Sequence, residues 1–353
     1  MNIQAAITLL VGGGTLTFSE AQAVMTQIVE GGAADAQLGA FLTALRMKGE
    51  SVEEIAAFAS VLRGHCVKIN PTVNGALVDT AGTGGDSIKT FNVSTVAAIV
   101  AAAAGAKVAK HGGRAVSSRC GSADILEALG VNVAARPDIV RSCIERVGIG
   151  FMYAPIFHPV FKSAAQVRKD IGIRTVFNIL GPLTNPASAN RQLVGVSEPA
   201  LTERMCGALG MLGSQGAYVV HGLIGIDEIS ILGATRISEF KDGKVTTNEI
   251  TPQMFGLKEA QSKADITAGD PQTNLRITVN VLQGRESSNL DMVLLNAGAV
   301  LNLAGVAHSI AQGVDKAREA IASGRVLDTL QRFVKESGGD PTRLEKVLHE
   351  FSN

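Results

Sequence analysis

The sequence predicts an α/β protein in which a small all-helical domain accompanies a larger α/β domain with a mostly parallel central sheet. Two observations predict this class. The first seventy residues combine helix start signals with apolar residues at helical spacing. After Asn70-Pro71, short apolar segments followed by glycine-rich loops alternate with helical runs, which is typical of a parallel sheet covered by helices on both faces.

Two capping boxes predict helices in the N-terminal part. Residues 17–20 and 51–54 each place a hydroxyl three positions before a glutamate, so that both side chains can satisfy free N–H groups at a helix start. Between them, apolar residues at helical spacing predict one buried stripe: Leu38, Phe41, Leu42 and Leu45.

The remaining elements follow from apolar runs and their boundaries. Strands are predicted at residues 76–79, 108–110 and 217–221, and helices at 95–104, 123–129, 290–304 and 314–333. Gly105 and Gly130 end the first two of these helices. Residues 236–241 and 244–249 flank Asp242-Gly243, which favours a two-residue hairpin turn and so predicts an antiparallel addition to the sheet.

Composition excludes several classes of protein. The chain has 353 residues, of which 46% are hydrophobic and 18% charged, so a sizeable core is expected. The chain has 32 basic and 32 acidic residues, so its net charge is zero and gives no general attraction to nucleic acid or to an anionic membrane. The longest apolar run, residues 96–106, is much shorter than the about 20 residues that a membrane-spanning helix needs.

The cysteines and the N-terminus indicate a cytoplasmic location. The four cysteines lie far apart without a Cys-x-x-Cys pair, which argues against a zinc site or a disulfide framework. No basic region precedes the first apolar stretch, so a secretory signal is not expected.

A glycine-rich loop follows the first predicted strand. Residues 82–86, Gly-Thr-Gly-Gly-Asp, would let backbone N–H groups approach an anion, although a plain turn explains this loop equally well. Residues 92–95, Asn-Val-Ser-Thr, begin the next helix. Capping by Asn92 or Ser94 and anion binding use the same N–H groups, so both interpretations stay open.

Two further loops follow predicted strands. Residues 110–122 hold Lys110, Arg114, Arg119, an imidazole and three serines but no carboxylate, and we interpret this loop as an anion-binding one. Residues 221–228 end in the adjacent carboxylates Asp227 and Glu228. Mg²⁺ is often held by one or two carboxylates plus substrate phosphates, but on their own these residues are better explained as solvent-facing. We expect the three loops to share one site beyond the carboxyl ends of the strands.

Several long segments resemble the signatures of the anthranilate phosphoribosyltransferases. Residues 79–86 and 91–95 resemble the family's opening signature, and residues 110–124 its second one. Residues 178–186, Asn-Ile-Leu-Gly-Pro-Leu-Thr-Asn-Pro, resemble its most recognisable stretch. The resemblance runs from Leu16 to the last helices, and chance does not explain several long motifs in one order.

The resemblance implies a nucleoside phosphorylase/phosphoribosyltransferase-like fold. A helical domain would comprise residues 1–70 with an inserted helical segment at about 163–185, and the α/β domain residues 71–162 and 186–353. It also implies homodimers formed through the small domain.

Carried over residue by residue, the resemblance implies a site for each substrate. Phosphoribosyl pyrophosphate would be bound by Gly82, Gly85, Asp86, Thr90, Asn92, Val93, Ser94, Thr95, Lys110, His111, Gly112, Gly113, Arg114, Ala115, Val116, Ser117, Ser118 and Ser122. Anthranilate would be bound by Gly82, Gly113 and Arg168, whose guanidinium suits a carboxylate. Up to two Mg²⁺ per subunit would be held by Ser94, Asp227 and Glu228.

The implied reaction transfers the phosphoribosyl group to the amine of anthranilate, giving N-(5-phosphoribosyl)anthranilate and pyrophosphate, in tryptophan biosynthesis. No residue is expected to act as a covalent nucleophile or an acid–base group, and His111 and Arg168 are expected to position ligands. A pyrimidine nucleoside phosphorylase and a nucleic-acid-binding relative without transferase activity are the alternatives. Asp227-Glu228 argues against the first, and the zero net charge against the second.

The chain departs from the family pattern at two places. The family usually has Asn, which contacts the aromatic acceptor, where this chain has Gly113. The change removes a side-chain amide that can both donate and accept. The family also usually has an Asp in the stretch where this chain has Leu223 and Ile224.

Overall fold

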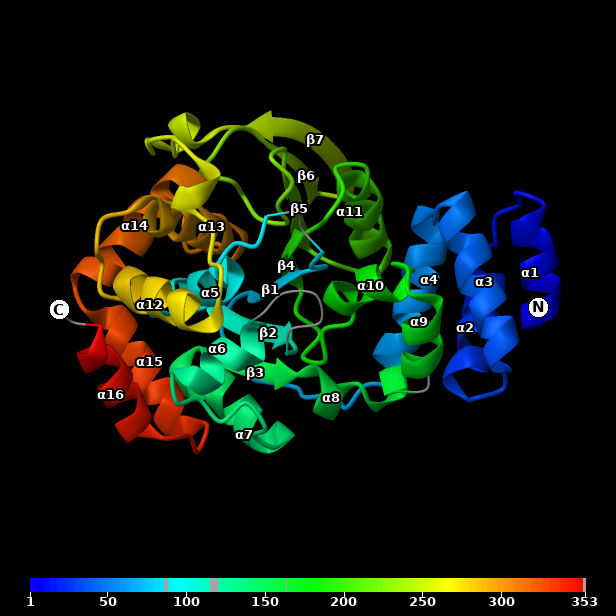
Figure 1. Ribbon diagram of the computed structural model, residues 1–353, viewed down its shortest axis with the longest axis horizontal. Coiled ribbons are helices and arrows are strands. Elements are labelled where there is room, and N and C mark those ends of the chain that lie inside the picture. The colour runs from blue at the N-terminus through cyan, green and yellow to red at the C-terminus, as the bar shows by residue number, and fades with distance from the viewer. Residues whose placement is uncertain (86–87, 115–119, 163, 352–353) are drawn as a thin grey trace.

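The computed structural model describes residues 1–85, 88–114, 120–162 and 164–351. A group of helices lies beside a larger α/β part, with the N-terminus at the outer edge of the helices and the C-terminus on the far side of the α/β part (Figure 1). Four helices form the N-terminal group: α1 (Ile3–Val11), α2 (Phe18–Val29), α3 (Asp35–Lys48) and α4 (Val52–Gly64).

Both predicted capping boxes are present at the starts of α2 and α4. In α4, Glu54 N donates to Ser51 Oγ at 3.1 Å and Ser51 N donates to Glu54 Oε2 at 2.8 Å. The Glu54 side chain is fully buried, and it also accepts hydrogen bonds from Leu16 N at 3.0 Å and Lys48 Nζ at 2.7 Å. One carboxylate therefore fixes both the start of α4 and the loop before α2. The predicted stripe on α3 is buried as well.

The sheet has seven strands in the order β3-β2-β1-β4-β5-β6-β7. The first five strands in this order are parallel, and β6 and β7 are antiparallel additions, as predicted. Asp242 and Gly243 both have positive φ, 50° and 78°, as a two-residue hairpin turn requires. The strands are β1 (Leu77–Gly82), β2 (Lys107–Gly112), β3 (Ile149–Tyr153), β4 (Arg191–Gly195), β5 (Gly216–Gly222), β6 (Thr235–Lys241) and β7 (Lys244–Ile250).

Helices cover both faces of the sheet because its strands bury side chains alternately on each side. Val220 and Leu193 face the core formed with the C-terminal helices, whereas Val219 and Val194 face the core shared with the N-terminal helices. The other helices are α5 (Val93–Ala103), α6 (Ser122–Ala128), α7 (Pro137–Ser142), α8 (Ala154–Phe157), α9 (Ala165–Ile171), α10 (Phe177–Leu180), α11 (Leu201–Met211), α12 (Pro271–Leu282), α13 (Ser288–Leu303), α14 (Ile310–Ala322), α15 (Arg325–Glu336) and α16 (Pro341–Glu350).

The helices α9 and α10 lie beside α3 and α4 rather than with the α/β part (Figure 1). Val167, Phe177 and Leu180 belong to the same buried cluster as the side chains of the N-terminal helices. The segment that carries them leaves the α/β part after β3 and returns to it at β4.

The prediction of one helix over residues 314–333 is wrong. The structure has two helices there, α14 and α15, separated by Ser323 and Gly324. Gly324 has φ of 78°, a left-handed conformation that ends the helical path and that glycine adopts without a steric cost. The apolar spacing continues on both sides of the break, so periodicity alone did not reveal it.

Helices α13 and α14 cross with their backbones in contact. A Cβ on Gly298 would lie 2.8 Å from Val314 N, and a Cβ on Gly313 would lie 2.8 Å from Gly298 Cα and overlap its carbonyl oxygen. Both positions therefore need glycine. Among the residues that the structure describes, no helix has the length and apolarity needed to cross a membrane.

We expect Glu54→Ala to lower the free energy of unfolding by about 3 kcal/mol, because it leaves Lys48 and two backbone N–H groups without their buried acceptor. Urea unfolding followed by circular dichroism would measure the change. Glu53→Ala on the same helix is the control, since Glu53 is exposed and its loss should cost about 0.5 kcal/mol or less. Equal unfolding midpoints for both variants would contradict the role of Glu54.

Candidate functional site

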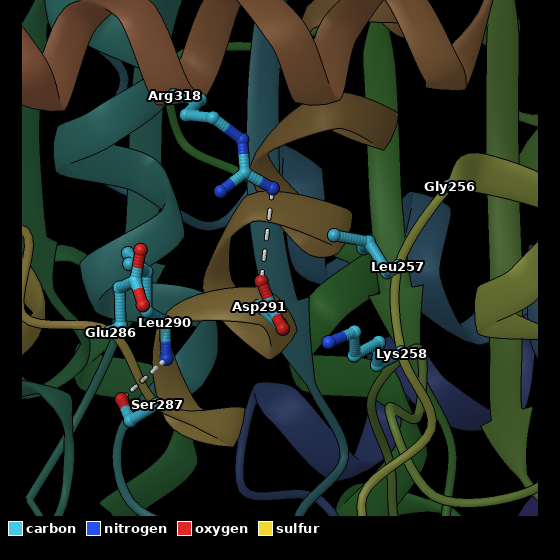
Figure 2. A pocket seen from close by; sticks show the side chains of 8 residues that line it. All are labelled: Gly256, Leu257, Lys258, Glu286, Ser287, Leu290, Asp291 and Arg318. Atoms are coloured by element: carbon cyan, nitrogen blue, oxygen red, sulfur yellow. Dashed lines mark hydrogen bonds and ion pairs between the residues drawn. The ribbon is translucent and has the colours of Figure 1, made fainter.

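One surface cavity, with a volume of about 260 Å³, lies away from the three predicted ligand loops. Arg318 Nη2 and Asp291 Oδ1 approach to 3.8 Å across it (Figure 2). It is lined by Gly256, Leu257, Lys258, Glu286, Ser287, Leu290, Asp291 and Arg318. Its two cations face two carboxylates, so it has no excess charge for a phosphorylated ligand.

The predicted loops meet instead at the carboxyl ends of the central strands. In the sheet, β2 and β3 are added on one side of β1, and β4 and β5 on the other side. The topological switch point therefore lies between β1 and β4. Ligands of open α/β sheets bind outside such a switch point. The turn after β1 begins beside the end of β4, where Thr83 N donates to Gly195 O at 2.9 Å.

Asp227 reaches this turn from the loop after β5. Its Oδ2 accepts a hydrogen bond from Gly84 N at 2.9 Å. A Cβ on Gly82 would lie 2.6 Å from the same oxygen, and a Cβ on Gly195 would overlap the Asp227 carbonyl oxygen. Burial raises the pKa of Asp227, and the hydrogen bond from Gly84 opposes this shift. The two glycines therefore make room for a carboxylate at the ends of β1 and β4.

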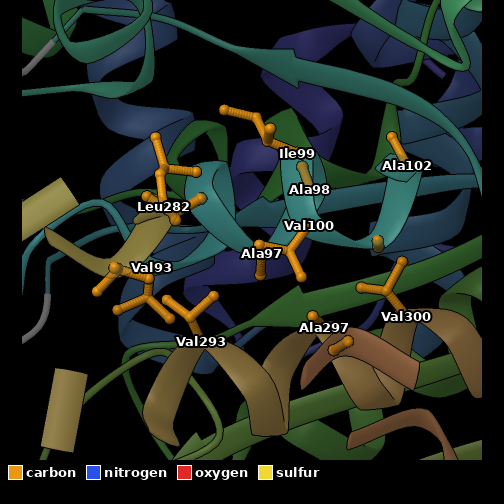
Figure 3. Close-up of a cluster of buried hydrophobic side chains, with 14 of the residues drawn as sticks. Val93, Ala97, Ala98, Ile99, Val100, Ala102, Leu282, Val293, Ala297 and Val300 are labelled. Atoms are coloured by element: carbon orange, nitrogen blue, oxygen red, sulfur yellow. The ribbon is translucent and has the colours of Figure 1, made fainter. Parts of the chain in front are cut away.

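Glu228 and Ser94 lie next to each other at the start of α5. Ser94 N donates to Glu228 Oε1 at 3.3 Å, so this carboxylate occupies the helix N-terminus, where free N–H groups favour an anion. Helix α5 is fixed by close packing, with Val93, Ala97 and Val100 near the α13 side chains Val293, Ala297 and Val300 (Figure 3). The three predicted metal ligands, Ser94, Asp227 and Glu228, thus come from two segments that converge.

Lys110 points from β2 toward the same place. Its side chain is 2% exposed. Its Nζ donates to the carbonyl oxygen of Thr80, to Thr80 Oγ1 at 3.3 Å and to Ser94 Oγ at 3.4 Å. Burial lowers the pKa of Lys110, whereas the carboxylates of Asp79, Glu228 and Asp227 oppose this shift. The structure therefore places a buried cation beside the predicted metal ligands.

His111 points to the opposite face of the sheet from Lys110, because neighbouring residues of a strand alternate. Its ring lies 4.8 Å from that of His158, and burial lowers the pKa of His111 to about 3. The ring is thus neutral near pH 7.

The buried carboxylate of Asp79 accepts two hydrogen bonds at this place. His111 N donates to Asp79 Oδ1 at 3.1 Å, and Asn185 Nδ2 donates to Asp79 Oδ2 at 2.7 Å. Burial raises the pKa of Asp79 to about 6.

The other predicted residues at the starts of α5 and α6 are linked by polar contacts. Asn92 Nδ2 donates to Cys120 O at 3.3 Å, and Asn92 Oδ1 is buried with no hydrogen-bond partner among the described residues. Thr95 Oγ1 and Ser122 Oγ lie 3.1 Å apart. Thr90 forms an isolated bridge with Thr267.

The described part of the second loop differs from its sequence-based interpretation in one respect. Arg114 forms ion pairs of 2.8 Å with both Asp124 and Glu127 of α6. The positive charge of Arg114 is therefore paired with carboxylates that lie outside the loop. Glu127 and then Asp124 raise the pKa of Arg114. A Cβ on Gly113 would meet no atom of the described residues within 4 Å, so the first atom of a side chain is accommodated at this position.

Five of the predicted donor-binding residues lie outside the described residues: Asp86, Ala115, Val116, Ser117 and Ser118.

Two arginines of the segment between β3 and β4 differ in their contacts. Arg168 lies 5.5 Å from the ring centroid of Phe177, and burial lowers its pKa. Arg174, which the sequence did not single out, donates from Nη2 to Thr83 O at 3.3 Å and so contacts the turn after β1. Nothing in the local sequence distinguishes it from a surface arginine, because its partners lie far away in the chain.

The donor set around Asp227 fits magnesium. The residues that the structure describes include no group of three His, Cys, Asp or Glu side chains that could hold a metal ion by themselves. Two carboxylates and a hydroxyl are nevertheless brought together beside backbone N–H groups. Mg²⁺ commonly uses such a partial set and completes its coordination with water and substrate phosphates.

Two models of the glycosyl transferase family match the chain, the helical bundle domain at residues 4–66 and the a/b domain at residues 74–327. The chain is 48% identical to the anthranilate phosphoribosyltransferase of Acetivibrio thermocellus, over 94% of this chain and 96% of that protein. It is 49% identical to that of Methanocorpusculum labreanum, over 92% of this chain and 95% of that protein.

Solved structures agree with this relationship. The anthranilate phosphoribosyltransferase (TrpD) of Thermus thermophilus is 41% identical with a TM-score of 0.88, covering 94% of this chain and 99% of that one. The Saccharomyces cerevisiae enzyme in complex with PRPP and Mg is 29% identical with a TM-score of 0.86, covering 95% of this chain and 98% of that one. The chain belongs to the anthranilate phosphoribosyltransferase family.

Proposed function

We propose that this chain transfers the phosphoribosyl group of phosphoribosyl pyrophosphate (PRPP) to the amine of anthranilate, releasing pyrophosphate, in tryptophan biosynthesis. The observation that supports it most is that Asp227 contacts the turn after β1 while Glu228 and Ser94 lie together at the start of α5, where Lys110 donates to Ser94 Oγ. A carboxylate pair, free helix N–H groups and a cation suit a donor that carries both phosphate and magnesium.

The donor lies, in this proposal, across the ends of β1 and β2. Lys110 and the start of α5 face the pyrophosphate, and Asn92 Oδ1 offers a buried acceptor that a ribose hydroxyl can satisfy. The remaining donor-binding residues are those that the resemblance implies, from Gly82 to Ser122. The Arg114 side chain must exchange its carboxylate partners on α6 for phosphate oxygens if it contacts the donor.

The acceptor is held by Gly82, Gly113 and Arg168 in this proposal. A guanidinium can pair both oxygens of the anthranilate carboxylate in one plane. Partial burial of Arg168 strengthens such a pair, since fewer water molecules compete for it.

Magnesium, up to two ions per subunit on Ser94, Asp227 and Glu228, would neutralise charge that develops on the departing pyrophosphate. The chain's own residues position the two substrates, which supplies much of the acceleration. The bond between the anomeric carbon and pyrophosphate breaks, and the lone pair of the neutral arylamine attacks from the opposite face. The amine then releases its proton to water. Burial lowers the pKa of His111 to about 3, which makes its imidazole a weak base, so we assign it no proton transfer.

We also propose the assembly and the domain division of the family. Residues 1–70 and about 163–185 would form the helical domain, and residues 71–162 and 186–353 the α/β domain; shared packing of Val167 and Phe177 with the N-terminal helices supports this. The chain would form a homodimer through the helical domain and act in the cytoplasm.

Purified protein mixed with anthranilate, PRPP and Mg²⁺ should consume anthranilate, seen as a loss of its fluorescence. Samples without the donor, or with EDTA, should show no loss. A parallel sample with thymidine or uridine and inorganic phosphate tests nucleoside phosphorolysis. Phosphorolysis without anthranilate consumption by the folded protein would overturn the proposed reaction.

We expect Asp227→Asn and Glu228→Gln each to lower kcat/KM by about 100-fold or more, because each removes a charge that the metal requires. Initial rates over a Mg²⁺ titration would measure this, and the variants should need more Mg²⁺ for half-maximal rate. Glu203→Gln, an exposed position on α11, is the control and should leave the titration unchanged. Unchanged Mg²⁺ dependence in Asp227→Asn would contradict the assignment of this ligand.

Gly113→Asn should lower the KM for anthranilate by about 3-fold or more at saturating PRPP, because the amide adds a hydrogen bond to the acceptor. Gly113 does not have a positive φ, and a Cβ there meets no described atom within 4 Å, so we expect a normal fold for this variant. Gly113→Ala is the matched control, since it stiffens the backbone without adding a donor or acceptor. If both variants change KM equally, backbone stiffness explains the effect and the amide does not.

A further inference from the structure

Arg174 approaches the turn after β1 from an element on the other side of the site. It lies in the short connection between α9 and α10, next to the N-terminal helices. Its Nη2 donates to Thr83 O at 3.3 Å, and its guanidinium interacts electrostatically with Asp227. One cation therefore touches the turn and lies near a predicted metal ligand.

The glycine at position 85 lies directly against this arginine. Gly85 has φ of 84°, and a Cβ there would overlap Nη1 of Arg174 and lie 3.1 Å from Nη2. Gly84 also has positive φ, but a Cβ there would meet no atom of the described residues within 4 Å. Of these two glycines, only the one at position 85 lies against the guanidinium, so the turn and Arg174 fit each other.

The connection that carries Arg174 is itself fixed. Thr175 and Val176 are 3% and 1% exposed, and Thr175 N donates to Asn178 Oδ1 at 2.9 Å. Phe177 packs in the buried cluster of the helical part. Arg174 therefore extends toward the turn from a rigid base, although its own side chain is partly exposed.

We propose that Arg174 is a positioning residue of the donor site: from the segment between β3 and β4 it holds the Gly82–Gly85 turn against Asp227 in the conformation that receives the donor's phosphates. This inference rests on the proposed function. It assigns a role in donor binding to a residue outside the loops that carry the family signatures.

A guanidinium suits this task better than an ammonium. Its planar fork donates in fixed directions, whereas the lysine head is a compact point charge on a flexible stem. Arg174 restricts the conformations of the turn before the donor binds. Donor binding therefore costs less conformational entropy. Loss of Arg174 should consequently weaken donor binding more than acceptor binding.

Isothermal titration of the full-length protein with PRPP and Mg²⁺, without anthranilate, tests this inference. We expect Arg174→Ala to raise the Kd for PRPP by about 10-fold or more, as loss of a charged hydrogen bond predicts. Arg174→Lys should restore only part of the affinity. At saturating PRPP, the KM for anthranilate should change by about 2-fold or less in both variants.

Hydrogen exchange without ligand gives a second readout that does not depend on activity. The amides of Thr83 and Gly84 donate to Gly195 O and Asp227 Oδ2, and they should exchange about 10-fold faster in Arg174→Ala. Arg136→Ala is the matched control, because Arg136 is an exposed arginine paired only locally with Asp138 among the described residues. It should alter neither readout.

Failure of this inference differs from failure of the proposed function. If the unaltered protein does not bind PRPP, the proposed function is wrong. If it binds PRPP and Arg174→Ala binds it equally well, the positioning role is wrong. Equal losses of donor affinity, acceptor affinity and thermal stability in Arg174→Ala would show general support of the fold, and would also overturn the specific role.

Discussion

The site depends on the close approach of the Asp227 loop to the ends of β1 and β4. The loop after β5 comes so near that a Cβ on residue 195 would overlap the Asp227 backbone, and a Cβ on residue 82 would displace the Asp227 carboxylate. The approach lets Asp227 accept a hydrogen bond from Gly84 N, which joins the turn after β1 to the loop after β5. This hydrogen bond brings two segments that are far apart in the chain together at the proposed metal site. The next residue, Glu228, then accepts a hydrogen bond from Ser94 N at the start of α5.

Strand β2 supports this arrangement from both of its faces. Lys110 brings a cation to the site, while the next residue, His111, turns into the interior on the other side. There the carboxylate of Asp79 receives hydrogen bonds from His111 N and from Asn185 Nδ2. A buried carboxylate needs such partners, and satisfying them fixes the relative position of β1, β2 and the segment before β4.

Local signals in the sequence predicted much of the fold. The capping boxes, the strands ahead of the glycine loops and the Asp242-Gly243 hairpin depend on neighbours within a few residues, and all are present. The break at Gly324 was missed because apolar spacing continues across it. Arg174 and the α6 partners of Arg114 were missed for another reason. Their roles depend on contacts between separate segments, which a residue pattern does not contain. Likewise, the glycines at 82 and 85 were interpreted as space for a ligand, but protein side chains occupy much of that space.

The crossing of α13 and α14 has a consequence for how this protein can evolve. At most contacts in a core, a larger residue on one side can be compensated by a smaller one on the other. At Gly313 the obstacle to a new side chain is the backbone of Gly298, and at Gly298 the obstacles include the backbone atoms Val314 N and Ile310 O. A smaller side chain on the facing helix does not remove a backbone obstacle, so it does not compensate for a substitution at either glycine. Helix α13 also packs on α5, whose N-terminus faces the site. The close crossing of α13 and α14, which restricts residues 298 and 313 to glycine, therefore also supports the helix on which the site depends.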